Sequence, residues 1–204
     1  MLALVVLASL VLQLVLLFTT GADASAGRTG GPADERLRRF FSYFTIESNL
    51  FVLAAATVLA LRPRQDGPVW RVVRLDALLG IVITGLVYAL VLAPRLDLTG
   101  GALVATIGLH YVSPVMALLG WLVFGPRPRI TWRTVVVAFV WPVLWLVYTF
   151  TQGAVTDWYP YPFLDVTELG FGTAVRNALV VVVLGVAIAA CFRFLDRRLV
   201  PAPR

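Results

Sequence analysis

The residues best suited to chemistry in this sequence are hydroxyl, amide and imidazole side chains that lie inside long apolar runs. Thr45, Ser48 and Asn49 stand close together, and His110 is the only histidine of the chain. A hydroxyl beside a neutral imidazole is the minimum for nucleophilic acyl transfer, because the hydroxyl is a poor nucleophile until a base takes its proton. Thr45 and His110 are therefore a candidate nucleophile and base.

The spacing of these polar residues predicts that they divide between two faces of a helix. At ~100° per residue, Thr45, Ser48 and Asn49 share one face about 100° wide, whereas Glu47 points to nearly the opposite side. On the first face, Asn49 is of the right type to stabilise an oxyanion, and Ser48 is an alternative nucleophile. Glu47 is expected to be a structural hydrogen-bond or ion-pair partner on its own side, or a contact of the substrate.

Depth in the membrane is a second condition for a shared site. At ~1.5 Å per residue, Thr45 lies roughly 7 Å below Phe40. Ser48 and Asn49 lie roughly 12 to 13 Å below Phe40 on the same rise. His110 lies roughly 12 Å below Ala102 on the same rise. The polar residues around Thr45 and His110 therefore reach the same depth if their two helices tilt modestly. The alternative is structural, since Thr and Ser often bond their own backbone in membrane helices and a lone histidine can join two helices.

A segment rich in aromatic and proline residues, 157–165, precedes the last apolar run. It is typical of an interfacial aromatic belt, and it could equally be a lid over the outer half of the protein. Tyr161 and Asp165 from this segment and Arg176 just after it are candidate substrate contacts. Arg176 is placed to receive a carboxylate or to balance Glu47.

The elements that must position these residues are membrane-spanning helices. The chain is 60% hydrophobic and 14% charged, with a mean hydropathy of +0.88, which leaves too little polar surface for a soluble globule. A span needs about 20 mainly apolar residues. The sequence therefore predicts an all-α, six-helix bundle in a single membrane domain, 1–204, with Pro142 kinking the fifth helix. The predicted spans are 1–20, 40–61, 75–93, 101–124, 135–151 and 173–192.

Composition excludes several classes of protein. Lysine is absent, which rules out Schiff-base chemistry. With Cys191 and His110 as single representatives of their types, the chain has no intrachain disulfide, no cysteine zinc site and no bis-histidine haem. The net charge of +6 comes from arginines that flank apolar runs, so we expect a lipid bilayer and no nucleic acid as partner. No metal or cofactor is implied.

The first apolar run has two interpretations. Residues 1–20 resemble a secretory signal, and Ala24-Ser25-Ala26 offers small residues suitable for cleavage. Against this, no basic residue precedes Arg28, and the run is long enough to span a membrane. A retained helix is the preferred interpretation.

Arginine distribution predicts the orientation. The loops after helices two and four and the C-terminal tail hold 11 of the 17 basic residues, and the opposite side holds 6. Because arginine-rich loops stay in the cytoplasm, both termini are predicted to be cytoplasmic, in a multi-pass protein of the cell membrane.

Three segments of the chain carry a resemblance to known families. Residues 43–50, 110–114 and 161–165 occur in order, at matching helix positions, and together they resemble the bacterial Pr6Pr family and, more distantly, the androgen-induced-gene family of transmembrane hydrolases. The resemblance covers nearly the whole chain. Members of the second family hydrolyse fatty acid esters of hydroxy fatty acids with an intramembrane threonine and a histidine, and the matching positions here are Thr45 and His110.

Two functions of different classes follow. The first is an intramembrane hydrolase in which a long-chain lipid ester reaches the site sideways from the outer leaflet, Thr45 attacks its carbonyl and His110 moves the proton. The second is a non-enzymatic membrane protein, such as a small-solute or lipid transporter, whose polar cluster lines a binding cavity. Few polar residues occupy the inner halves of the helices beyond Asp76, and this asymmetry favours a site open to one side.

Overall fold

The computed structural model describes residues 1–23, 27–28 and 31–199. Within these ranges six helices are long and apolar enough to cross a membrane, as predicted, which identifies a multi-pass membrane protein. The spans are Leu2–Thr19, Phe44–Leu61, Pro68–Arg95, Gly100–Phe124, Trp132–Thr156 and Phe171–Arg198. The candidate cleavage site Ala24-Ser25-Ala26 lies outside the described residues.

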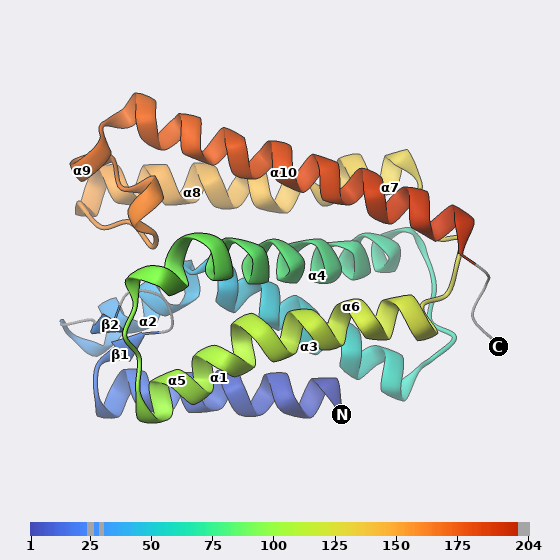
Figure 1. Ribbon diagram of the computed structural model, residues 1–204, viewed down its shortest axis with the longest axis horizontal. Helices are drawn as coiled ribbons and strands as arrows, with labels where there is room; N and C mark the ends of the chain where they lie inside the picture. The colour runs from blue at the N-terminus through green and yellow to red at the C-terminus, as the bar shows by residue number, and fades with distance from the viewer. Residues whose placement is uncertain (24–26, 29–30, 200–204) are drawn as a thin grey trace.

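The helices form a bundle around α4 (Pro68–Val87), which lies between two groups of helices (Figure 1). One group is α1 (Leu2–Thr19), α3 (Phe44–Leu61), and α5 (Gly100–Ile107) with α6 (Ser113–Phe124). The other is α7 (Trp132–Ala138), α8 (Val140–Thr156) and α10 (Phe171–Arg198). Hydrocarbon offers no partner for backbone N–H and C=O groups, so helices are the form in which such apolar runs cross it.

Short elements gather at the end of the bundle opposite the N-terminus (Figure 1). They are β1 (Ala22–Asp23) paired antiparallel with β2 (Gly27–Arg28), α2 (Ala33–Ser42), η2 (Ala93–Arg95), η4 (Pro162–Leu164) and α9 (Val166–Leu169). Met1 and the C-terminal end of α10 both lie toward the other end of the bundle (Figure 1). That both termini lie on one side of the membrane stays a prediction. Which side is cytoplasmic stays a prediction.

The second predicted span, 40–61, begins later than expected. Tyr43 has extended backbone angles, φ −75° and ψ 124°, and separates α2 from α3. Helix α2 carries acidic residues in its first turn and Arg39 in its last. A segment of this charge does not enter hydrocarbon, so the chain changes direction at Tyr43 before it crosses.

Prolines interrupt three of the spans. Phe139 separates α7 from α8, because Pro142 has no N–H to donate to the carbonyl of Ala138. The predicted kink in the fifth span is thus confirmed. Pro94 and Pro114 each follow a π-helical segment, η1 (Tyr88–Leu92) and η3 (Gly108–Val112), which the sequence did not predict.

Candidate functional site

Thr45 and His110 meet inside the bundle. Thr45 lies in the first turn of α3 and His110 in the π-helical segment η3, and the distance from Thr45 Oγ1 to His110 Nε2 is 3.3 Å. Both residues are buried, at 2% and 1% exposure. This separation falls within the roughly 3 to 6 Å that a hydroxyl and its base require, allowing for one bridging water.

The second ring nitrogen of the histidine fixes where its proton lies. His110 Nδ1 is 3.1 Å from the backbone oxygen of Thr106. A carbonyl only accepts hydrogen bonds, so Nδ1 carries the proton and Nε2 presents a lone pair to Thr45. This is the tautomer that a general base for the threonine hydroxyl requires.

The two π-helical segments lie against each other and against α4 around His110. Pro114 leaves the carbonyl of His110 without an α-helical donor, and Gly85 of α4 packs here: a Cβ on Gly85 would lie 3.0 Å from the Pro114 ring and 3.2 Å from that carbonyl. Tyr88, the first residue of η1, stacks on the imidazole with a centroid distance of 4.0 Å. Irregular turns of this kind are frequent at functional sites.

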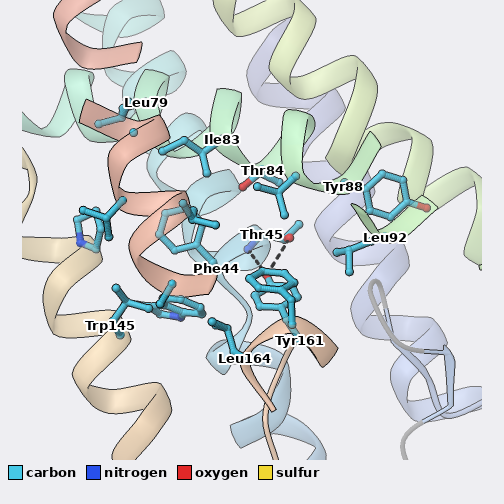
Figure 2. A pocket seen from close by; sticks show the side chains of 18 of the residues that line it. Phe44, Thr45, Leu79, Ile83, Thr84, Tyr88, Leu92, Trp145, Tyr161 and Leu164 are labelled. Atoms are coloured by element: carbon cyan, nitrogen blue, oxygen red, sulfur yellow. Dashed lines mark hydrogen bonds between the residues drawn. The ribbon is translucent and has the colours of Figure 1, made fainter. Parts of the chain in front are cut away.

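Tyr161 is the third side chain at the threonine. Its hydroxyl lies 3.2 Å from Thr45 Oγ1 and accepts the Thr45 backbone N–H, also at 3.2 Å (Figure 2). The ring is 5% exposed and packs edge-on against Tyr43 and flat on Phe163. Burial raises the pKa of Tyr161 to about 12, so the phenol keeps its proton at physiological pH.

Asn49 supports the site from below. Its Nδ2 donates to the backbone oxygens of Thr45, at 2.9 Å, and Leu109, at 3.2 Å. The amide hydrogens thus hold α3 against η3, and they do not point at a position where an oxyanion would form. Its Oδ1 has no hydrogen-bond partner among the residues that the structure describes.

Other predicted residues lie apart from the pair. Ser48 accepts a hydrogen bond from Thr84 of α4 at 3.3 Å, and no contact with His110 is found in the described part of the chain. Glu47 points away, as predicted, and its Oε2 accepts the Trp141 indole N–H at 2.6 Å. Asp165 accepts backbone N–H groups at the start of α9, which is the role of an N-cap. Arg176 is exposed on α10, and within the described ranges it forms no ion pair with Glu47.

An apolar pocket that opens to the outside of the bundle lies against this cluster. Thr45 and Tyr161 form part of its wall, and Leu79 and Ile83 of α4 line it further from them (Figure 2). The wall on the far side comes from α8 and α10 and includes Gly185. Neither His110 nor Arg176 lines it, so Thr45 lies between the cavity and His110.

Sequence reasoning missed two members of the cluster. Tyr88 stacks on the histidine, and the carbonyl of Thr106 sets its tautomer. The i to i+4 spacing of Thr106 and His110 is a signal that a helical reading could have used. The role of Tyr88 depends on two irregular turns meeting in space, for which a single sequence offers no marker.

Comparison of the chain with known protein families, with curated proteins and with solved structures gave no match. The resemblance to the Pr6Pr and androgen-induced-gene families therefore stays a prediction that rests on the segments 43–50, 110–114 and 161–165.

Proposed function

We propose that this protein is an intramembrane hydrolase of long-chain lipid esters, with Thr45 as nucleophile and His110 as base. The observation that carries the proposal is the 3.3 Å approach of Thr45 Oγ1 to the unprotonated nitrogen of His110, at the wall of an apolar cavity. The resemblance to hydrolases of fatty acid esters of hydroxy fatty acids selects the same two residues.

The reaction proceeds in two balanced halves. Thr45 Oγ1 bonds to the ester carbon while its proton passes to His110 Nε2, and the carbonyl π pair moves to the oxygen. Collapse breaks the bond to the alkoxide, which takes the proton from His110 and leaves as an alcohol. Water then attacks the acyl-threonine with the same proton route, which releases the fatty acid and restores the hydroxyl.

The surroundings favour an acyl chain over a polar solute. The cavity wall is built almost entirely of aliphatic and aromatic side chains, and two of its few hydroxyl groups, those of Thr45 and Tyr161, lie 3.2 Å apart. A site of this kind binds an apolar chain and fixes its position through a few polar groups. With both termini in the cytoplasm, Thr45 lies in the outer half of the membrane, and the substrate arrives from the outer leaflet.

Hydrolysis of fatty acid esters of hydroxy fatty acids by purified protein in liposomes tests the proposal. Thr45→Val keeps the shape of the side chain and removes the hydroxyl, and His110→Ala removes the base. We expect each to lower kcat by roughly 1,000-fold or more, and the double variant to lose little beyond either single one. An acyl adduct on Thr45, seen by peptide mass after a rapid quench, should accompany activity.

Ser48→Ala is the matched control, because it removes a hydroxyl from the same helix that is paired with Thr84. It should hydrolyse within a few-fold of the unmodified protein. If the well-folded protein cleaves none of a panel of lipid esters, or if His110→Ala retains full activity, the hydrolase proposal is wrong and a transporter or other non-enzymatic role takes its place.

A further inference from the structure

The hydrogen bonds around Thr45 determine which group donates in each of them. His110 Nδ1 donates to the carbonyl of Thr106, so Nε2 accepts, and the hydrogen on Thr45 Oγ1 goes to it. The 3.2 Å contact between Thr45 Oγ1 and the Tyr161 hydroxyl then has no hydrogen left on the threonine side. Tyr161 is consequently the donor of that bond, while its oxygen accepts the backbone N–H of Thr45.

A donor aimed at the attacking oxygen changes role during the reaction. When Oγ1 bonds to the ester carbon it becomes an ether-type oxygen and a weaker acceptor, and the negative charge appears on the carbonyl oxygen one carbon away. A phenol that already lies against Oγ1 is within reach of that oxygen. Stabilisation of an oxyanion by a fixed donor in a water-poor site is among the largest single terms in acyl transfer.

The position of Tyr161 is held from several sides. Asn177 of α10 donates to the carbonyl of Phe163 at 2.9 Å, which ties the segment 160–164 to the last helix. Tyr43, Trp145 and Phe163 enclose the ring. A donor fixed before the substrate arrives needs no reorganisation at the moment of reaction.

We propose that Tyr161 is a catalytic residue, the oxyanion donor of the hydrolase, in the place that sequence reasoning gave to Asn49. This inference rests on the proposed function. Tyr161 keeps its proton throughout: it donates to Oγ1 in the resting protein, to the oxyanion in each tetrahedral intermediate, and to Oγ1 again after deacylation. The amide of Asn49 remains bonded to two backbone carbonyls and takes no part.

Tyr161→Phe removes the donor and keeps the packed ring. We expect kcat to fall by roughly 100- to 1,000-fold, with KM changed by no more than a few-fold, because the interaction forms only with the developing charge. Tyr159→Phe is the matched control: it makes the same change in the same loop, at a ring that packs on Phe150 and Gly153 and not on Thr45. It should leave kcat within a few-fold.

A binding measurement separates a catalytic role from a structural one. A long-chain trifluoromethyl ketone forms a tetrahedral adduct with a reactive hydroxyl, whereas the matching ether lipid has no carbonyl. Tyr161→Phe should weaken the ketone by about the factor lost in kcat/KM and leave binding of the ether lipid unchanged. Equal weakening of both ligands would show disturbed packing and overturn the inference.

The outcomes also distinguish this inference from the function on which it rests. Full activity in Tyr161→Phe, with Thr45→Val and His110→Ala inactive, overturns the role of Tyr161 and leaves the hydrolase standing. Absence of ester hydrolysis by the unmodified protein overturns both.

Discussion

At the scale of single residues, the polar side chains in the N-terminal half of α3 divide among three neighbours. Thr45 and Asn49 face η3, Ser48 faces Thr84 of α4, and Glu47 faces Trp141 of α8. Helical spacing placed Ser48 with Thr45 on one face about 100° wide. The difference arises because a face of that width contacts two helices at once. Ser48 lies at the edge of the face that contacts α4, whereas the rest of the face contacts η3.

The Glu47 contact is expected to serve stability alone. Removing the carboxylate with Glu47→Ala, or the indole N–H with Trp141→Phe, should each lower the free energy of unfolding by about 1 to 3 kcal/mol, the cost of leaving the other partner of the bond unsatisfied. The double variant should lose less than the sum, because the two changes break the same bond. Hydrolysis per folded molecule should stay within a few-fold in all three.

Thermal unfolding in detergent and activity normalised to folded protein measure both quantities. Glu47→Gln is the conservative companion, since an amide oxygen still accepts the Trp141 N–H. It should lose less stability than Glu47→Ala. A strong loss of kcat in folded Glu47→Ala would contradict this assignment and connect Glu47 to the chemistry.

The sequence could predict the candidate pair but not its full surroundings. Thr45 and His110 were recognisable because each is a polar residue in an apolar run at a matching depth. The exposed position of Arg176 and the capping role of Asp165 were not, because a residue near a helix start is equally placed for a ligand, a cap or solvent until the loop geometry is known. Those two residues were predicted as substrate contacts, and neither lines the cavity.

At the scale of elements, the depth of the cavity depends on how α10 approaches α4. Gly185 lies at the cavity wall, where a Cβ would meet Ile83 at 3.2 Å and the Phe139 ring at 3.6 Å. In the third span, the lining residues Leu79 of α4 and Tyr88 of η1 are nine positions apart, about 13 Å along the axis. A larger side chain at Gly185 therefore fills the part of the cavity that would hold the distal end of an acyl chain.

If the protein is the proposed hydrolase, Gly185→Leu should shift its acyl-chain preference toward short chains. We expect kcat/KM for palmitate esters to fall roughly ten-fold or more, since lost methylene contacts in an apolar pocket are worth about that much, while butyrate esters are little affected. Rates across butyrate, octanoate and palmitate esters of one alcohol measure the shift.

Gly120→Leu on α6 serves as its control, because nothing lies within 4 Å of a Cβ at that position. An unchanged chain-length profile in Gly185→Leu would place the acyl chain elsewhere in the bundle.

Element prediction succeeded where a single physical property decides the outcome. Six spans follow from hydrophobic length, and the break at Phe139 follows from Pro142. The break at Tyr43 has no proline or glycine, and it depends on packing of that ring against Trp158 and Tyr161 from a distant loop. The π-helical segments likewise form where Gly85 lets η3 approach α4, which only the assembled bundle defines.

At the scale of the whole molecule, ion pairs and hydrogen bonds join the loops to the helices at the end of the bundle where α10 ends. Asp196 of α10 accepts the backbone N–H groups of Arg129 and Ile130, at 2.7 and 2.8 Å. Asp66 pairs with Arg71 and with Arg129, at 2.7 and 3.3 Å. The bond from Arg71 holds the pKa of Asp66 well below its usual range. These contacts join the loop 125–131 to α10 through Asp196 and to the loop 62–67 through Asp66.

Orientation is the property of the whole molecule that remains to be measured. Because the predicted loops after the second and fourth spans and the C-terminal tail hold 11 of the 17 arginines, reporters fused after Gly67 and at the C-terminus should report cytoplasm, and one inserted at Gly30 should report the outside. Gly30 itself lies outside the described residues. A C-terminal reporter active on the outside would reverse the orientation and place Thr45 in the inner leaflet.

The position of Tyr161 also sets the order in which the site is made. Thr45 and Tyr161 stand 116 residues apart in the chain, with His110 between them. At roughly 5–20 residues per second, about 6 to 23 s of synthesis separate the two side chains. During that interval the nascent protein has the threonine but no phenol beside it. Membrane lipids are thus exposed to the complete site only after the fifth span has been inserted and the loop that follows it has been made.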